Sequence, residues 1–167
     1  MIEPKDDLTG AGLDAHIAGL EAAVLSAFPR SAVITPDEVQ GPAASLREAV
    51  TSVGWPTLGA TRGRVILWLG EHGPLSARYS ADHSSLSGRL MFTMAPSIEA
   101  PTAAIFNRND AVGGEEAIRT LVAAGFVVRT RAASVQHRAA GDRAVIDAAL
   151  RSGAQVISSD FPVPIGE

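Results

Sequence analysis

The sequence predicts an α/β fold with about five parallel strands and flanking helices. Short apolar runs without alternation, at 64–69 and 90–94, are typical of strands buried on both faces, as in a parallel sheet. Apolar residues at three- and four-residue steps lie between these runs and predict amphipathic helices. Residues 126–161 run from one apolar segment through a helical stretch to a second apolar segment, which is the form of one βαβ unit.

The first part of the chain predicts two helices and two strands. A helix that ends near Pro29 is indicated by the apolar stripe Leu13, Ile17, Leu20, Val24 and Phe28. A short β-rich run at 31–35 follows. A second helical stripe covers 46–53, with Gly54 as its cap. The loop at 55–58 carries a tryptophan as an aromatic anchor and leads to the buried strand at 64–69.

The second part predicts further strands, of which the last two are those of the βαβ unit at 126–161. Residues 75–87 are polar and serine-rich, which indicates a connecting loop or a short helix before the strand at 90–94. A short strand at 104–106 comes next, and then a helix that Gly125 caps. The last helix is expected to begin at Asp142, and the last strand to cover 155–158.

Polar residues follow two of the predicted strands. Asp37 and Glu38 stand after the first strand, where carboxylates favour the start of a helix. Asn107, Arg108, Asn109 and Asp110 follow the strand at 104–106. These side chains could coordinate a cation or a hydroxyl-rich ligand, or they could be turn residues, which asparagine and aspartate favour for backbone reasons.

Arg129, Arg131 and Asp160 form the candidate ligand site. Arg129 and Arg131 lie two residues apart near the end of a strand, so their side chains share one face. Asp160 follows the next strand, and parallel α/β folds gather their ligand groups at the carboxyl ends of strands. Two guanidinium groups there would clamp a phosphate. The alternative is a surface feature or an ion pair with a nearby carboxylate.

Composition narrows the classes of protein. The chain has 167 residues, enough for one domain with a core, and 46% of them are hydrophobic. Its net charge of −4 gives no sign of a nucleic-acid surface. It has no cysteine, which excludes disulfides and thiolate ligands. No signal peptide is expected at the polar N-terminus, and no apolar run has the length of a membrane span, so the sequence leaves the localisation unknown.

The final segment carries a family resemblance. Ser152-Gly153-Ala154-Gln155 and then Ser158-Ser159-Asp160-Phe161-Pro162 are similar to the last strand of calcium-dependent, phosphatidylinositol-specific phospholipase C-like proteins, which belong to the TIM-barrel superfamily of phosphodiesterases. The resemblance covers about residues 13–162. It also takes in four shorter motifs, Ile34-Thr35-Pro36-Asp37, Trp55-Pro56-Thr57-Leu58, Arg62-Gly63-Arg64 and Asn109-Asp110.

The resemblance implies a partial TIM barrel. A complete barrel needs eight strands in about 250 residues, so residues 1–167 are expected to form a single partial domain that matches the second half. In the family, the histidine pair that acts as general base and general acid comes from the first half, as do most calcium ligands. The histidines at 16, 72, 83 and 137 lie in no matching motif. The resemblance therefore assigns no catalytic residue, no metal ligand and no cofactor in this chain, with Ca²⁺ belonging to full-length relatives, which are often secreted.

What the resemblance carries over is phosphate binding by Arg129, Arg131 and Asp160, with a phosphoinositide headgroup or another phosphorylated small molecule as partner. Two departures weaken the match. Gly70 stands where the family commonly has an acid, although Glu71 and His72 are adjacent, and residues 132–134 replace acids that the family often has.

A half barrel leaves strand edges without neighbours. The missing half could precede this chain in a longer protein, a second copy or another chain could pair with it, or its own helices and loops could cover the edges. Three functions follow: the C-terminal part of a lipid-cleaving phosphoric diester hydrolase that is inactive alone, a non-catalytic phosphate-binding or subunit-pairing module, or an unrelated α/β domain whose arginines form ion pairs.

Overall fold

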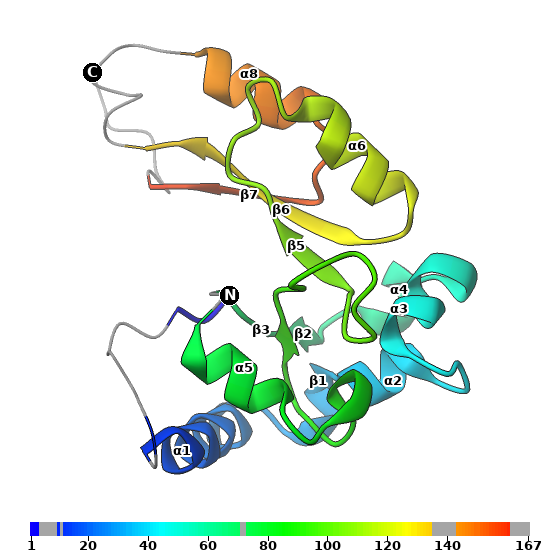
Figure 1. Ribbon diagram of the computed structural model, residues 1–167, viewed down its shortest axis with the longest axis vertical. Helices are drawn as coiled ribbons and strands as arrows, with labels where there is room; N and C mark the ends of the chain where they lie inside the picture. Colours follow the sequence, from blue (N-terminus) through cyan, green and yellow to red (C-terminus); the bar gives the residue numbers. More distant parts are fainter. Residues whose placement is uncertain (4–9, 11, 71–72, 135–142, 161–167) are drawn as a thin grey trace. The chain divides into compact units, whose positions relative to one another are not determined.

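The computed structural model describes residues 1–3, 10, 12–70, 73–134 and 143–160 (Figure 1). The chain divides into two compact units, residues 1–104 and residues 105–167. Each unit is described by itself below.

The first unit begins with α1 (Gly12–Ala27), the helix that the apolar stripe predicted. Leu13, Ile17 and Val24 are its buried residues, and Pro29 follows its end. The elements after it are mostly short, because proline, glycine and threonine interrupt the chain at close intervals. They are η1 (Arg30–Ala32), β1 (Val33–Ile34), α2 (Pro36–Gln40), α3 (Leu46–Glu48), η2 (Ala49–Val53), α4 (Leu58–Thr61), β2 (Val65–Ile66), β3 (Trp68–Leu69), α5 (Pro74–Ser80), η3 (Ser84–Leu86) and β4 (Phe92–Thr93).

The strands of the first unit pair in parallel, as their continuous apolar runs predicted. β1 pairs with β2, and β3 pairs with β4. The run predicted as one strand at 64–69 therefore changes its partner at Leu67. Ile2 forms a further parallel bridge to Leu69, with its N–H donating to the Trp68 carbonyl over 2.9 Å. The N-terminal residues thus add to the edge of β3.

The acids after β1 begin a helix, as predicted. Thr35 caps α2 by accepting a hydrogen bond from the backbone N–H of Glu38. Glu38 then forms a two-pronged ion pair with Arg64, at 2.5 and 2.6 Å. The hydrogen bonds from Arg64 lower the pKa of the Glu38 carboxyl, although its partial burial opposes this. The Asp37 carboxylate accepts from the backbone N–H of Gly88.

Tyr79 is the largest fully buried side chain of the first unit. Its hydroxyl donates to Glu21 over 2.6 Å and accepts from the backbone N–H of Met91 over 3.0 Å. The guanidinium of Arg89 lies 4.4 Å from the centre of its ring. Burial raises the pKa of the Tyr79 hydroxyl well above its usual value, and the hydrogen bond to Glu21 raises it further.

The described residues of the second unit form a three-stranded parallel sheet and two helices. Its elements are β5 (Ile105–Asn107), α6 (Glu115–Ala123), β6 (Val127–Ala133), α8 (Ala144–Arg151) and β7 (Val156–Ser159), and the strand order is β5-β6-β7. Figure 1 shows α6 and α8 on the same face of this sheet. Between the helices and the sheet lies a core that includes Phe106 and Phe126, whose rings meet edge to face at 5.0 Å. The predicted start of the last helix, Asp142, lies outside the described residues.

The predicted α/β class with short parallel strands is confirmed. The strand pairings in the described part of the chain form two two-stranded sheets and one three-stranded sheet, and they show no closed barrel. Among the described residues, no helix has the length and apolar character needed to cross a membrane.

Candidate functional site

The candidate site lies on the sheet of the second unit, on the face opposite α6 and α8. Side chains alternate along β6, so Val128 and Thr130 point to the helices, where both are fully buried, while Arg129 and Arg131 point to the other face. Asn107 of β5 is in register with Arg129, and Ser158 of β7 is in register with Arg131. We call Asn107, Arg129, Arg131 and Ser158 the polar sheet face.

Arg129 is bound within the protein. Its side chain is only 6% exposed, and its Nη1 donates to the Oδ1 atoms of Asn107, over 3.1 Å, and of Asn109. The backbone supports the same junction: Arg108 N–H donates to the Arg129 carbonyl, and the Thr130 hydroxyl donates to the Arg108 carbonyl. Arg129 therefore fixes the segment after β5 against β6.

The polar cluster at 107–110 was expected either to hold a ligand or to form a turn. The structure gives two of its members a third role, because Asn107 and Asn109 are hydrogen-bond acceptors for a buried guanidinium. Asp110 is exposed. Sequence reasoning missed this pairing. The one signal that could have suggested it is that two asparagines follow one strand while an arginine occupies the strand beside it.

Arg131 lies two residues further toward the carboxyl end of β6. It is half-buried, and its Nε is buried without a hydrogen-bond partner among the described residues. A guanidinium stays charged at every physiological pH and presents its donors in a fixed planar fork. A buried donor without a partner is unfavourable, so an anion that accepted from Arg131 would stabilise this arrangement.

Two other arginines of this unit, Arg119 on α6 and Arg151 on α8, form ion pairs with carboxylates. Arg151 donates to Glu115 over 3.0 Å, and Arg119 lies 3.7 Å from the same carboxylate. The hydrogen bond from Arg151 lowers the pKa of Glu115. Arg131, by contrast, has no carboxylate partner in the described part of the chain.

Asp160 follows β7 directly and is exposed. Because Arg131 is in register with Ser158, Asp160 and Arg131 both lie toward the carboxyl ends of adjacent parallel strands. Asp160 forms no ion pair within the described residues. Arg129 is thus joined to Asn107 of β5 and to Asn109 after it, whereas Arg131 and Asp160 lie nearer the carboxyl ends of β6 and β7.

The histidines give no catalytic pair within the described part of the chain. His16 lies half-buried on α1. The Nδ1 atom of His83 is 2.7 Å from the backbone carbonyl oxygen of Ser87, which occupies that nitrogen. His72 and His137, together with Glu71, lie outside the described residues. In the residues that are described, no group of three or more histidine, cysteine, aspartate or glutamate side chains could hold a metal ion.

Gly70, where an acid was expected, is buried under the N-terminal segment. A Cβ atom built on Gly70 would lie 2.6 Å from Cγ and 2.7 Å from Sδ of Met1, and 3.0 Å from Cγ of Glu3. Any side chain at this position would require Met1 to move. Glycine at position 70 leaves room for the Met1 side chain, which the pairing of Ile2 with β3 brings over Gly70.

Comparison with known protein families gives one match. The model of the family described as phosphoinositide phospholipase C, Ca²⁺-dependent, matches residues 11–167. A search of curated proteins and a search of solved structures each found no match.

Proposed function

The chain belongs to the Ca²⁺-dependent phosphoinositide phospholipase C family, and from this premise we propose that it binds the phosphate of an inositol phosphodiester through Arg131. Arg129 supports the site from the neighbouring position on β6, and Asp160 lies at its rim. The chain forms the phosphate-binding side of a partial barrel of the phospholipase C type and does not cleave the ester by itself.

The observation that carries this proposal is the buried Nε of Arg131, which has no acceptor in the described part of the chain. The family acts on phosphodiesters, whose oxygens are strong acceptors. A planar guanidinium can donate two parallel hydrogen bonds to such a group, and these are stronger than bonds between neutral partners. Arg129 lies two residues before Arg131 on β6 and is held in place by its hydrogen bond to Asn107. Its positive charge would attract a phosphate without direct contact.

Two observations support binding without cleavage. Transfer of a proton to and from the reacting oxygens needs a base and an acid with pKa values near neutrality, the role of histidine in this family. His83 is engaged by a backbone carbonyl, and His16 lies on α1 with no second histidine in a shared motif. In the described residues, no group of three or more histidine, aspartate or glutamate side chains lies together as a metal site. We propose that the histidine pair and any calcium ligands belong to polypeptide outside this sequence.

The binding test uses purified protein and myo-inositol 1-phosphate, followed by calorimetry or NMR. Loss of a charge-assisted hydrogen bond costs about 1.5–3 kcal/mol, so Arg131→Gln should weaken binding by roughly 10- to 100-fold. Arg131→Lys keeps the charge but loses the planar fork, and should weaken binding less than Arg131→Gln. Arg119→Gln, which removes one exposed positive charge from α6, is the matched control and should bind like the wild type.

The cleavage test uses phosphatidylinositol vesicles with Ca²⁺. The proposal expects no turnover above the background by the wild-type chain. Turnover that Arg131→Gln abolishes would show that the chain is an active enzyme. Two results would refute the phosphate site itself. One is a folded wild-type protein that does not bind inositol phosphate, and the other is equal affinity for it in Arg131→Gln and Arg119→Gln.

A second candidate function is subunit pairing, which one observation favours. β7 is an outer strand of the three-stranded sheet, and its Ile157 side chain is 37% exposed. An outer strand presents unpaired backbone groups that another chain can pair with. If this edge joins two copies, Ile157→Lys should lower the mass measured by light scattering from that of a dimer to that of a monomer. A wild-type chain that is monomeric at all concentrations would contradict this candidate.

A further inference from the structure

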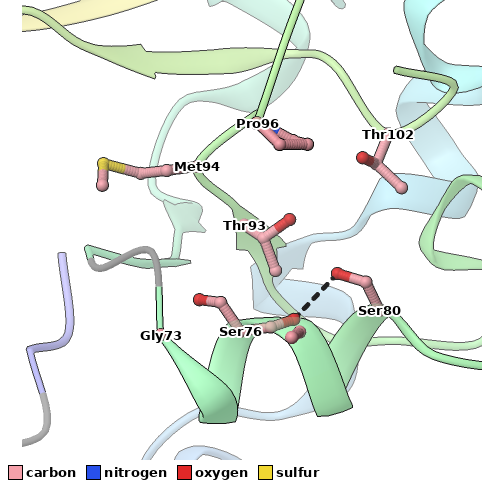
Figure 2. Close-up of a pocket in the computed structure, with 8 residues that line it drawn as sticks. Gly73, Ser76, Ser80, Thr93, Met94, Pro96 and Thr102 are labelled. Carbon is pink, nitrogen blue, oxygen red and sulfur yellow. Dashed lines mark hydrogen bonds between the residues drawn. The ribbon is translucent and has the colours of Figure 1, made fainter.

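Two adjoining hollows in the first unit lie along α5. The first has a volume of about 360 Å³ and the second about 480 Å³, and both are lined by Ser80 and Thr102. Pockets of this size, ~300–1,000 Å³, are typical of small-molecule sites. Figure 2 shows the first hollow, between α5 and the residues at the end of β4. We call the two together the hydroxyl groove.

The polar lining of the groove consists mainly of hydroxyl groups. Among the described residues that line the first hollow, every polar side chain is a serine or threonine and none is charged. The second hollow adds further serines and, at one side, Asp82 and His83. Within the described part of the chain, no lysine or arginine lines either hollow. The hydroxyl-bearing residues are Ser76, Ser80, Ser84, Ser85, Thr93 and Thr102.

Two of these hydroxyl-bearing residues are buried, and the side-chain oxygen of one of them has no partner among the described residues. Thr93 is 2% exposed, and in Figure 2 its hydroxyl points into the hollow. Ser85 is also 2% exposed, and its Oγ is buried without a hydrogen-bond partner. Ser80 differs, because its hydroxyl donates to the Ser76 carbonyl over 3.0 Å. Since buried hydroxyl groups are nearly always hydrogen-bonded, the Ser85 hydroxyl lacks a partner that a ligand could supply, and the Thr93 hydroxyl is directed toward the same groove.

The turn that holds Ser85 is not the conformation the chain would adopt by local preference. Ser85 has a φ of 53°, Leu86 a φ of 65° and Asp82 a φ of 63°, all in the left-handed region that disfavours residues other than glycine. Packing holds this turn in place, since Leu86 is fully buried. The Ser85 side chain is therefore kept at the second hollow by the tertiary structure.

The hydroxyl groups of the lining indicate which kind of ligand the groove could bind. A hydroxyl group can both donate and accept, so it matches another hydroxyl better than it matches an ion. An anion would find no lysine or arginine among the described lining residues, and the second hollow includes the acidic residue Asp82. The aliphatic side chains of Ala77, Met94 and Pro96 offer contacts for the C–H surface of a ring. We propose that the hydroxyl groove binds a small uncharged polyhydroxyl compound of the size of a monosaccharide or cyclic polyol.

This site is independent of the proposed phosphate site, because every residue that lines it belongs to the first unit. It requires no catalysis and no metal. A negative result for the groove would therefore leave the phosphate proposal intact, and a negative result for phosphate binding would leave the groove proposal intact. Binding to the groove should be unchanged in Arg131→Gln.

The test is protein-detected NMR of the full chain titrated with glucose, myo-inositol and inorganic phosphate. The two neutral compounds represent the proposed class, and phosphate represents an anion. We expect shifts of the Ser76, Ser80, Thr93 and Thr102 amides with at least one neutral compound. Thr93→Val keeps the side-chain shape and removes the hydroxyl, so it should weaken that binding by roughly three- to tenfold.

A second variant protects the test against a folding defect. Ala77 lines the groove but lies exposed on α5, so Ala77→Leu should narrow the first hollow, keep the unfolding temperature and abolish binding. Thr51→Val is the matched control. It removes an exposed hydroxyl that donates to the Arg47 carbonyl, away from the groove lining, and should leave binding unchanged. Absence of shifts with both neutral compounds at millimolar concentrations overturns the proposal, as does binding of phosphate alone or binding that Ala77→Leu leaves intact.

Discussion

Arg129 and Asn109 should be strongly coupled in stability. The guanidinium is 6% exposed and donates to two amide oxygens, so solvent screens these bonds little. Hydrogen bonds to a charged group contribute about 1.5–3 kcal/mol each. Arg129→Met loses both bonds but also relieves the free-energy cost of a buried charge, which is several kcal/mol. The single substitution thus mixes opposing effects, whereas the coupling energy between Arg129→Met and Asn109→Ala isolates one bond.

The assay is urea unfolding of the wild type, both single variants and the double variant, followed by a double-mutant cycle. We predict a coupling free energy of about 1.5–3 kcal/mol. The control cycle combines Arg129→Met with Arg151→Ala, since Arg151 pairs with Glu115 rather than with the asparagines, and it should be additive within about 0.5 kcal/mol. Additivity of the Arg129 and Asn109 substitutions would refute the idea that this guanidinium fixes the segment after β5.

Three further predictions concern stability. Because the ion pair with Arg64 lowers the folded-state pKa of Glu38, this pair stabilises the fold above pH about 4.5 and is lost as the pH falls through the lower folded-state value. Glu38→Gln should remove that pH dependence, which solvent screening limits to about 0.2–1 kcal/mol in unfolding experiments. Tyr79→Phe leaves the buried Met91 N–H without its acceptor and removes a hydrogen bond to the half-buried Glu21, so it should lower the free energy of unfolding by about 1–3 kcal/mol. Gly114→Ala should lower it by about 1–3 kcal/mol, because a Cβ there would lie 2.3 Å from the Asp110 carbonyl oxygen.

Each of these predictions has its own contrary result. A Glu38→Gln protein with the same acid sensitivity as the wild type would assign that sensitivity to other carboxyl groups. Unchanged stability in Tyr79→Phe would mean that water reaches the partners of the hydroxyl. Gly19→Ala is the control for Gly114→Ala. It lies in the middle of α1 with open space around it, so it should raise the unfolding free energy by about 0.5–1 kcal/mol.

Local patterns predicted most of the elements correctly. The apolar stripe at 13–28 became α1, because burying one face of a helix depends on residues close in sequence. The continuous run at 64–69 became parallel strands for the same local reason. The spacing of Arg129 and Arg131 predicts that they share one face of a strand, and both residues lie in β6.

Contacts between residues that are far apart in the sequence could not be predicted. Nothing local indicates that Ile2 bridges to Leu69, or that this pairing brings Met1 over Gly70. The two arginines looked equivalent in sequence, yet Arg129 is bound by asparagines more than 19 residues away and Arg131 is not. Such differences depend on the register between strands, which sequence spacing alone does not determine.

The most direct test of the account is the affinity of the purified chain for myo-inositol 1-phosphate, measured by calorimetry for the wild type, Arg131→Gln and Arg119→Gln. The account predicts binding by the wild type and by Arg119→Gln, and a loss of roughly 10- to 100-fold in Arg131→Gln. Equal affinity in all three proteins, with each of them folded, would contradict it.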